Sequence, residues 1–224
     1  MKLNLAKQSI GITILYAVIL AFIFSTPVAL AGDNVSFSVG AFGGFATSMT
    51  GEAVDGYQDT EWETGGAFGG SIMYRMANGL MFELLIEQFE MGLEENGDDF
   101  GTLKATPILL MVGYQSLPKQ ITGFAFHATI GGGMASSDFE KGDVVKDLEN
   151  ASGGNIDISN DSAFMFELGA GMDYFFTKNI ALTLDGRFLS GSIDSKWKNN
   201  NGNTEDFTLQ ASNFQGLVGV RFWF

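Results

Sequence analysis

The stretch Phe214-Gln215-Gly216-Leu217-Val218-Gly219-Val220-Arg221-Phe222-Trp223-Phe224 decides how the rest of the chain is interpreted. In an extended chain, successive side chains point to opposite faces. One face of this stretch then carries Phe214, Val218, Val220, Phe222 and Phe224, and the other carries Gln215, Leu217, Arg221 and Trp223. This period of two predicts a β-strand with one apolar and one mixed face, ending on an aromatic residue.

The amino-terminal 31 residues have the pattern of a secretory signal peptide. Lys2 and Lys7 give a basic start, residues 10–24 form an apolar run, and Ala29-Leu30-Ala31 fits the small-residue cleavage pattern. The run is shorter than the ~20 apolar residues that a spanning helix needs. We therefore expect a cleavable signal peptide at 1–31 and one mature domain at 32–224, with a retained anchor as the alternative.

The charge and the cysteine content of the chain argue against some classes of function. The chain has 26 acidic and 12 basic residues, a formal net charge of −14, and no cysteine. An acidic chain is poorly suited to binding nucleic acid. The lack of cysteine excludes disulfides and thiolate metal sites.

The same alternation recurs in seven segments before the last one, so eight strands are predicted. They lie near residues 35–45, 64–74, 80–87, 101–115, 123–130, 164–174, 180–188 and 214–224. Weak, repeated alternation of this kind is typical of a transmembrane β-barrel. We predict an all-β fold, an eight-stranded antiparallel up-and-down barrel.

The connections between these strands alternate between long and short. Long polar connections lie near 46–63, 92–100, 135–162 and 190–210, and tight ones at 75–79, 116–120 and 177–179. Membrane barrels have short periplasmic turns and longer external loops. We therefore expect both termini on the periplasmic side and the long loops outside the cell.

Charged residues share the strand face opposite the Phe and Leu positions. Lipid does not accept them, so this face is predicted to line the lumen. The predicted lumen network comprises Arg75, Glu83, Glu87, Lys104, His127, Glu167, Asp173, Asp185, Arg187 and Arg221. Lys104 fits only if a bulge at Pro107 shifts the register of its strand.

The sequence leaves two interpretations of this charged network, as a plug or as part of a conduit. The interior of an eight-stranded barrel is filled by side chains, so the charges are expected to pair into a plug. The alternative is a narrow or gated conduit, opened by breaking a pair such as Glu87–Arg187 or Asp185–Arg221. A soluble barrel of the lipocalin type would need the reverse polarity, polar outside and apolar inside.

Aromatic residues gather where strands meet the short connections. Tyr74, Tyr114 and Tyr174 lie there together with the terminal Phe222-Trp223-Phe224. Such positions predict an interfacial girdle.

These features resemble the small outer-membrane β-barrel superfamily, which includes the OmpA membrane domain, the OmpX and OmpW types and porin-family barrel proteins. The resemblance spans the mature chain in topology. It is strongest where Gly219, Phe222, Trp223 and Phe224 are similar to the assembly signal read by the barrel-insertion machinery, although Val218 replaces a usual polar residue. It implies a monomer in the Gram-negative outer membrane, contacting lipid and lipopolysaccharide, without a cofactor.

The predicted loops hold most of the acidic residues, including the cluster Glu94-Glu95-Asn96-Gly97-Asp98-Asp99. We interpret them as a solvated acidic surface. Divalent cations bridging to lipopolysaccharide phosphates remain the alternative, although no loop has the ligand spacing of a dedicated calcium site.

No catalytic constellation is evident. The one histidine, His127, lies in mid-strand without a serine in phase, so we expect no enzyme and no metal. The predicted function is a structural or surface-interaction role with a plugged lumen. The alternative is a narrow channel for small or hydrophobic solutes.

Overall fold

The computed structural model describes residues 35–49, 53–55, 60–95, 97–116, 122–152, 154–198 and 204–224. The predicted signal peptide lies outside these residues, and so does most of the predicted 116–120 connection. Within the described part of the chain, no helix has the length and apolar character needed to cross a membrane.

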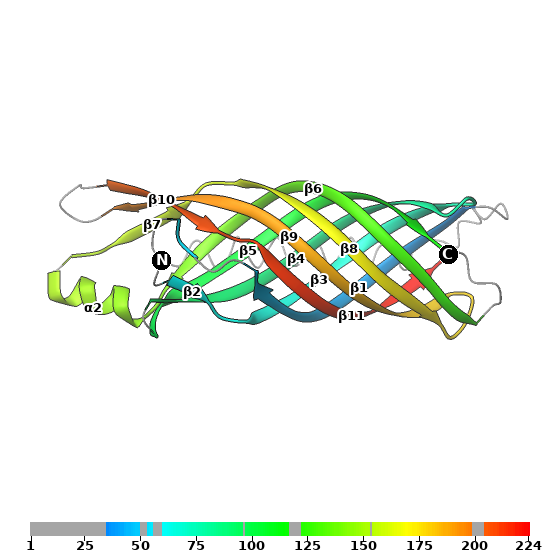
Figure 1. Ribbon diagram of the computed structural model, residues 1–224, viewed down its shortest axis with the longest axis horizontal. Helices are drawn as coiled ribbons and strands as arrows, with labels where there is room; N and C mark the ends of the chain where they lie inside the picture. Colours follow the sequence, from blue (N-terminus) through cyan, green and yellow to red (C-terminus); the bar gives the residue numbers. More distant parts are fainter. Residues whose placement is uncertain are drawn as a thin grey trace. The chain divides into compact units, whose positions relative to one another are not determined.

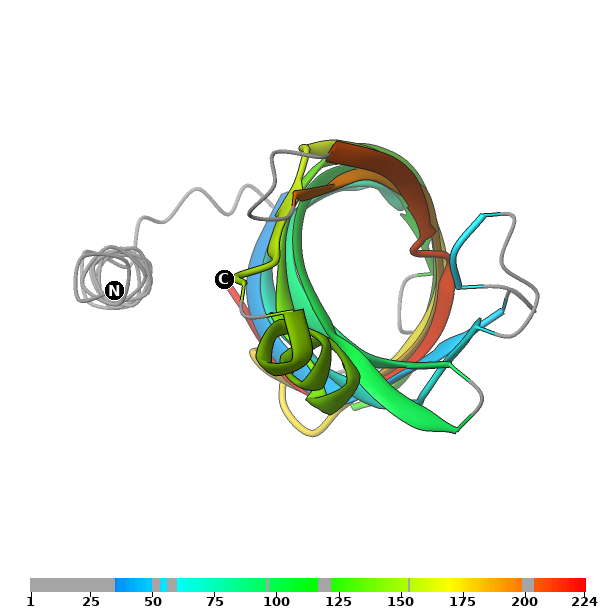
Figure 2. The ribbon, with the colours of Figure 1, turned by 90° about the vertical axis from the view of Figure 1, so that its left-hand side faces the viewer.

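Eight strands form a closed antiparallel ring, which confirms the predicted barrel (Figures 1 and 2). In ring order they are β1 (Val35–Ser48), β3 (Gly65–Met76), β4 (Leu80–Glu95), β5 (Asp98–Gln115), β6 (Gly123–Lys141), β8 (Ala163–Phe175), β9 (Ile180–Lys198) and β11 (Asn213–Trp223). Each strand pairs with its neighbour, and β11 returns to pair with β1. Closure leaves none of the eight as an unpaired sheet edge.

The closing contact depends on a glycine. Gly219 pairs with Phe42 across the β1–β11 seam. A Cβ atom at Gly219 would lie 2.4 Å from the carbonyl oxygen of Ala41 and 2.8 Å from the Cβ of Phe42. The two strands therefore pack too closely here for any side chain.

Three strands, β4, β6 and β9, are much longer than the sequence suggests, and β5 is slightly longer. β4 continues to Glu95, β5 begins already at Asp98, β6 reaches Lys141, and β9 reaches Lys198. Short strands add to this region: β2 (Thr60–Trp62) pairs with β4, while β7 (Asp157–Asn160) and β10 (Thr204–Gln210) pair with β9. Much of what was predicted as long polar loop is therefore barrel wall.

The two ends of the barrel differ. We call the end where β3 turns into β4, and β8 into β9, the turn end. The opposite end carries the helix α2 (Asp143–Ser152) and is called the helix end (Figure 1). Figure 2 views the barrel from the helix end, with α2 at one side of the rim.

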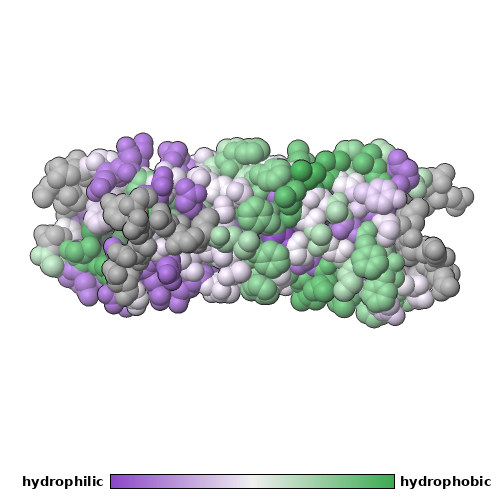
Figure 3. Space-filling view, viewed as in Figure 1, coloured by the Kyte–Doolittle hydropathy of each residue, from purple (hydrophilic) through white to green (hydrophobic). Residues whose placement is uncertain are grey.

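The wall reverses its polarity between the two ends. On β4, the outward Phe82 and Leu84 are exposed near the turn end, whereas outward positions further along are Gln88 and Glu90. Figure 3 shows the same change on the visible face, where apolar side chains predominate in the turn half and hydrophilic ones in the helix half. The apolar half has the character of a lipid-facing surface.

Inside the barrel the change runs the opposite way. The inward residues of β4 alternate between apolar and acidic in the turn half, at Met81, Glu83, Leu85 and Glu87. They are all apolar in the helix half, at Phe89, Met91 and Leu93, and every one of these residues is buried. On β9, Asp185 and Arg187 give way to Leu189 and Ile193. The helix half thus has an apolar interior and a polar exterior, as soluble barrels do.

The register of β5 is continuous through Pro107, which pairs with Ala135. The expected bulge at Pro107 is therefore wrong, and Lys104 stays in phase with the outward Ile108. The register shift instead lies between Leu93 and Glu94, opposite Phe100.

The polarity reversal predicts in which half of the barrel the outer surface tolerates a new charge. Leu110 faces outward in the apolar half and is 71% exposed, so Leu110→Lys should destabilise the barrel by about 2–4 kcal/mol in a bilayer. Thr102→Lys, outward on the same strand in the polar half, should cost about 1 kcal/mol or less. Urea unfolding of both variants in lipid vesicles tests this, and equal costs would contradict the proposed lipid-facing boundary.

Candidate functional site

The first centre of the lumen network is Arg187, on β9. Its guanidinium Nη2 lies 2.9 Å from Asp185 Oδ2, Nη1 lies 3.5 Å from Glu87 Oε2, and Nε lies 3.8 Å from Glu167 Oε1. The guanidinium also lies over the ring of Phe42, 4.4 Å from its centroid. Three carboxylates from three strands thus converge on one buried cation.

Two further side chains, His127 and Gln215, complete this centre. His127 Nε2 lies 2.8 Å from Asp185 Oδ1, and Gln215 donates a 2.9 Å hydrogen bond to Glu87 Oε1. Oε2 of Glu167 has no hydrogen-bond partner among the described residues. The centre therefore places three carboxyl groups around one guanidinium group.

The second centre is Arg221, on β11, nearer the turn end. Its Nη1 lies 3.2 Å from Asp173 Oδ2 and its Nη2 lies 3.4 Å from Glu83 Oε1. Gln115 donates a hydrogen bond of 2.5 Å to the same Asp173 oxygen. Arg221 is 1% exposed, so both ion pairs are formed away from solvent.

Gln115 links this centre to Arg75, which donates to Gln115 Oε1 at 2.8 Å. The guanidinium of Arg75 lies 4.5 Å from the ring centroid of Trp223. Trp223 in turn packs in a buried apolar cluster with Met73, Met81, Ala125, Phe175 and Ala181. Trp223 points inward on the same face of β11 as the charged Arg221. A cation–π contact and an apolar cluster near the turn end explain this position.

The structure brings together nine of the ten residues predicted to form the lumen network. Arg75 joins through Gln115, and the other eight are buried: Glu83, Glu87, His127, Glu167, Asp173, Asp185, Arg187 and Arg221. Of the two pairs suggested from the sequence, Glu87–Arg187 is present, whereas Arg221 pairs with Asp173 and Glu83 rather than with Asp185.

Lys104 does not belong to this network. Its Nζ lies 2.7 Å from Glu140 and 3.7 Å from Glu90, and its side chain is 30% exposed. Because the strand keeps its register at Pro107, Lys104 lies on the outer wall of the helix half. It forms a surface ion-pair group there.

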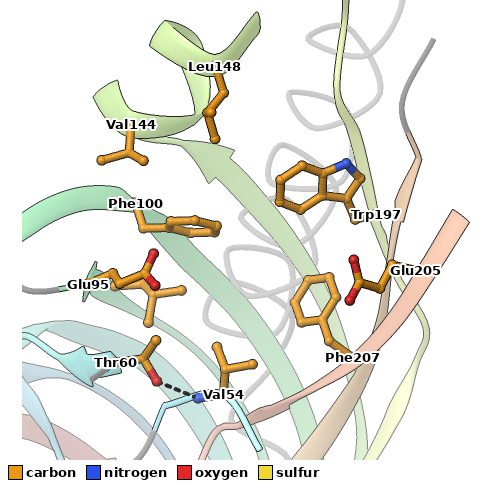
Figure 4. Close-up of a pocket in the computed structure, with 10 residues that line it drawn as sticks. Val54, Thr60, Glu95, Phe100, Val144, Leu148, Trp197, Glu205 and Phe207 are labelled. Carbon is orange, nitrogen blue, oxygen red and sulfur yellow. Dashed lines mark hydrogen bonds between the residues drawn. The ribbon is translucent and has the colours of Figure 1, made fainter. Parts of the chain in front are cut away.

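The interior of the helix half is apolar. Its buried side chains include Phe89, Met91, Leu93, Leu103, Leu109, Met165, Leu189, Ile193 and Leu209. Above them, towards α2, lies a cavity of about 220 Å³ (Figure 4). It is lined by Val54, Thr60, Leu93, Glu95, Phe100, Val144, Leu148, Trp197, Glu205 and Phe207.

Several elements build this cavity. Val144 and Leu148 extend into it from α2, while Trp197 on β9 and Phe207 on β10 form the opposite side (Figure 4). Phe100 comes from the β5 side of the register shift and packs 6.3 Å from the ring of Phe139. A β-bulge can re-aim a side chain in this way.

Sequence reasoning did not identify this cavity. All ten lining residues come from segments predicted to be loops, although the inward residues of these segments alternate just as those of the predicted strands do. Leu93, within the predicted loop 92–100, continues the alternation of Phe89 and Met91 before it. Phe42, Gln115 and Gln215 were also missed, because an aromatic or amide side chain on a lumen face carries no charge signal.

The predicted girdle residues lie on the outer surface near the turn end. Tyr114 is 57% exposed and Tyr174 36%, and the rings of Phe37 and Tyr74 lie 4.9 Å apart. Phe222 and Phe224 are exposed on the same outer wall, whereas Trp223 is buried.

Helix α2 is attached to the barrel rim through Glu149. Its carboxylate accepts hydrogen bonds from Lys141 Nζ and from the backbone N–H of Ile156, each 2.7 Å long. These bonds, first that of Lys141 and then that of Ile156, hold the pKa of Glu149 below its ordinary value. Since Val144 and Leu148 line the cavity, this contact also places one of its walls.

No group of three or more His, Asp or Glu side chains in the described ranges is arranged to hold a metal ion.

Comparisons with known proteins agree with the barrel. The family model described as "Outer membrane protein beta-barrel domain" matches residues 16–222. The outer membrane protein OprG from Pseudomonas aeruginosa superposes with a TM-score of 0.68 and 13% identity, covering 85% of this chain and 96% of that chain. No curated protein sequence matches the chain.

Two more distant structures are similar over comparable lengths. The E. coli Outer Membrane Protein W has a TM-score of 0.49 and 16% identity, over 84% of this chain and 97% of that chain. A major outer membrane protein from Thermus thermophilus also has a TM-score of 0.49, with 15% identity, over 85% of this chain and 99% of that chain. At such identities the likeness concerns the fold.

Replacing Arg187 should be costly. Arg187→Met leaves Glu87, Glu167 and Asp185 without their shared buried cation, so we expect a loss of about 3–5 kcal/mol of unfolding free energy. Lys104→Met, which breaks an exposed ion-pair group, should cost less than about 1 kcal/mol. Urea unfolding in lipid vesicles compares the two, and a small effect at Arg187 would show that the carboxylates do not depend on it.

The pH dependence of α2 follows from Glu149. Its folded pKa is lowered, so the stabilisation is fully present above the pKa of an unfolded Glu, about 4.3. It is lost as the pH falls through the lowered folded value. Amide-exchange protection across 143–152 should therefore drop below about pH 4. Glu149→Gln should lose the protection already at pH 7, whereas the exposed Asp147→Asn should behave as the unmodified protein.

Proposed function

Because the chain belongs to the outer-membrane protein β-barrel domain family and is located in the outer membrane, we propose that it is a non-enzymatic barrel that captures small apolar molecules at its helix end. In this proposal the helix end faces the cell exterior and both termini face the periplasm. The short turns at one end and the prolonged wall at the other support this orientation.

The observation that carries the proposal is an apolar cavity above an ion-paired lumen. Leu93, Phe100, Val144, Leu148, Trp197 and Phe207 give the cavity apolar and aromatic walls, which suit a small apolar ligand. Below the apolar interior, the lumen holds the Arg187 and Arg221 centres. A ligand can thus enter the mouth, and these paired charges act as a plug that blocks passage along the axis.

A non-enzymatic role agrees with the position of His127. It contacts Asp185 within the buried network, away from the cavity. General base catalysis needs a histidine within reach of a substrate. Here the imidazole of His127 contacts Asp185 and belongs to the lumen network.

A structural or surface-interaction role is the second candidate. The outer wall of the helix half carries Glu90, Asp138, Glu140 and Asp194, which would meet solvent, lipopolysaccharide or cations bridging to it. In the same proposal, the terminal strand from Gly219 to Phe224 is read by the barrel-assembly machinery. Monomeric barrels of this size need no further subunit to close their ring.

Ligand capture can be followed at one tryptophan. In lipid nanodiscs, 2-naphthylmethanol should shift the indole N–H resonance of Trp197 saturably, without moving that of Trp223 at the turn end. Leu148→Asp places a charge in the apolar wall and should weaken binding about tenfold or more, a loss of about 1.4 kcal/mol. Asn150→Asp adds the same charge elsewhere on α2 and should leave binding unchanged. No saturable shift at Trp197 would overturn the capture role in favour of the second candidate.

The plug is tested separately by conductance in planar bilayers. A lumen sealed by these ion pairs predicts no discrete channel steps for the unmodified protein. Discrete steps would instead support the alternative of a narrow axial channel.

A further inference from the structure

The cavity at the helix end is not uniformly apolar. Two carboxylates, Glu95 on β4 and Glu205 on β10, are among its ten lining residues. No Lys, Arg or His belongs to that described lining. The site thus combines an apolar interior with negative charge alone.

The two carboxylates lie on different walls. In Figure 4, Glu95 lies on the side of Phe100, and Glu205 lies across the cavity beside Trp197 and Phe207. Glu95 belongs to β4 and pairs with Thr60 of β2, while Glu205 pairs with Trp197 of β9. Their placement is therefore fixed by the ladders of the prolonged wall.

The remaining polar side chain of the lining has a structural contact. The Thr60 hydroxyl accepts a 3.1 Å hydrogen bond from the backbone N–H of Val54 (Figure 4). No ion pair to Glu95 or Glu205 is formed by the basic residues within the described ranges. The two carboxylates are thus the charged groups that a bound molecule would meet.

Desolvation then distinguishes between classes of ligand. A neutral molecule filling the cavity would leave the charge of both carboxylates uncompensated, and an anionic molecule would be repelled by them. A cationic group would compensate it through charge-assisted hydrogen bonds. The aromatic faces of Trp197, Phe207 and Phe100 favour a cation as well, because their π faces are negative.

We propose that the cavity takes a small amphiphilic monocation, with its apolar body against Phe100, Val144 and Leu148 and its ammonium group between Glu95 and Glu205. This rests on the proposed capture function and names its ligand class. The acidic balance of the whole chain, 26 acids to 12 bases, would also raise the local concentration of such a cation.

Three probes that share one apolar body test the charge preference. They are 2-naphthylmethylamine, which is cationic at pH 7, the neutral 2-naphthylmethanol, and the anionic 2-naphthoate. Binding is measured in lipid nanodiscs through the Trp197 indole resonance, with empty nanodiscs correcting for partition into lipid. We expect the cation to bind about tenfold more tightly than the alcohol, an advantage that falls with added salt, and the anion to bind most weakly.

The double variant Glu95→Gln/Glu205→Gln keeps the size of both side chains and removes their charge. It should lose the preference, binding the cation and the alcohol within about twofold of each other. Glu94→Gln/Asp206→Asn is the matched control. It removes the same charge from the next residue on each of the same strands, outside the cavity lining, and should keep the preference.

Each outcome bears on a different claim. Equal binding of all three probes to the unmodified protein would overturn the cation preference and leave the capture function standing. A preference that survives in the Glu95/Glu205 variant, or is lost in the control variant, would assign it to the general surface charge and also overturn the proposal. Binding of none of the probes would overturn the capture function itself.

Discussion

Backbone N–H and C=O groups find no hydrogen-bonding partner in the hydrocarbon of a membrane, so a sheet can cross it only as a closed ring. Here that condition is met by the pairing of β11 with β1, from Ser38–Trp223 to Ser48–Asn213. Gly219 allows the two strands to approach at this seam. The separation of an inside from an outside, on which every other feature depends, follows from this one contact.

A ring of eight strands encloses a space that side chains can fill. In the turn half, where lipid requires an apolar exterior, the polar residues of each strand are directed inward. They are buried, so they must compensate one another, as the carboxylates around Arg187 and Arg221 do. In the helix half the exterior is polar, and apolar residues occupy the interior.

The polarity reversal also bears on the soluble-barrel alternative. A lipocalin-like barrel would carry its charges outside, whereas Glu83 and Glu87 share the inner face, opposite the outward Phe and Leu positions. From Phe89 to Leu93 the same strand follows the opposite rule. The same paired strands thus have the polarity of a membrane barrel in the turn half and that of a soluble barrel in the helix half. The apolar interior of the helix half opens into the proposed ligand cavity.

The sequence by itself determined the strand number, the antiparallel order and the facing of most membrane residues. These features depend on the alternation of side chains along each single strand, which can be recognised without knowing how the strands pair. Charged residues such as Glu87, Asp185 and Arg187 then identify the inner face directly. Tertiary structure alone decided which charges pair, because partners come from strands distant in sequence. It also decided that Lys104 lies outside, since Pro107 is accommodated without a register shift. Finally, it created the cavity, because Glu95, Phe100, Leu148 and Glu205 face one another only when the prolonged strands are paired and α2 lies at their rim.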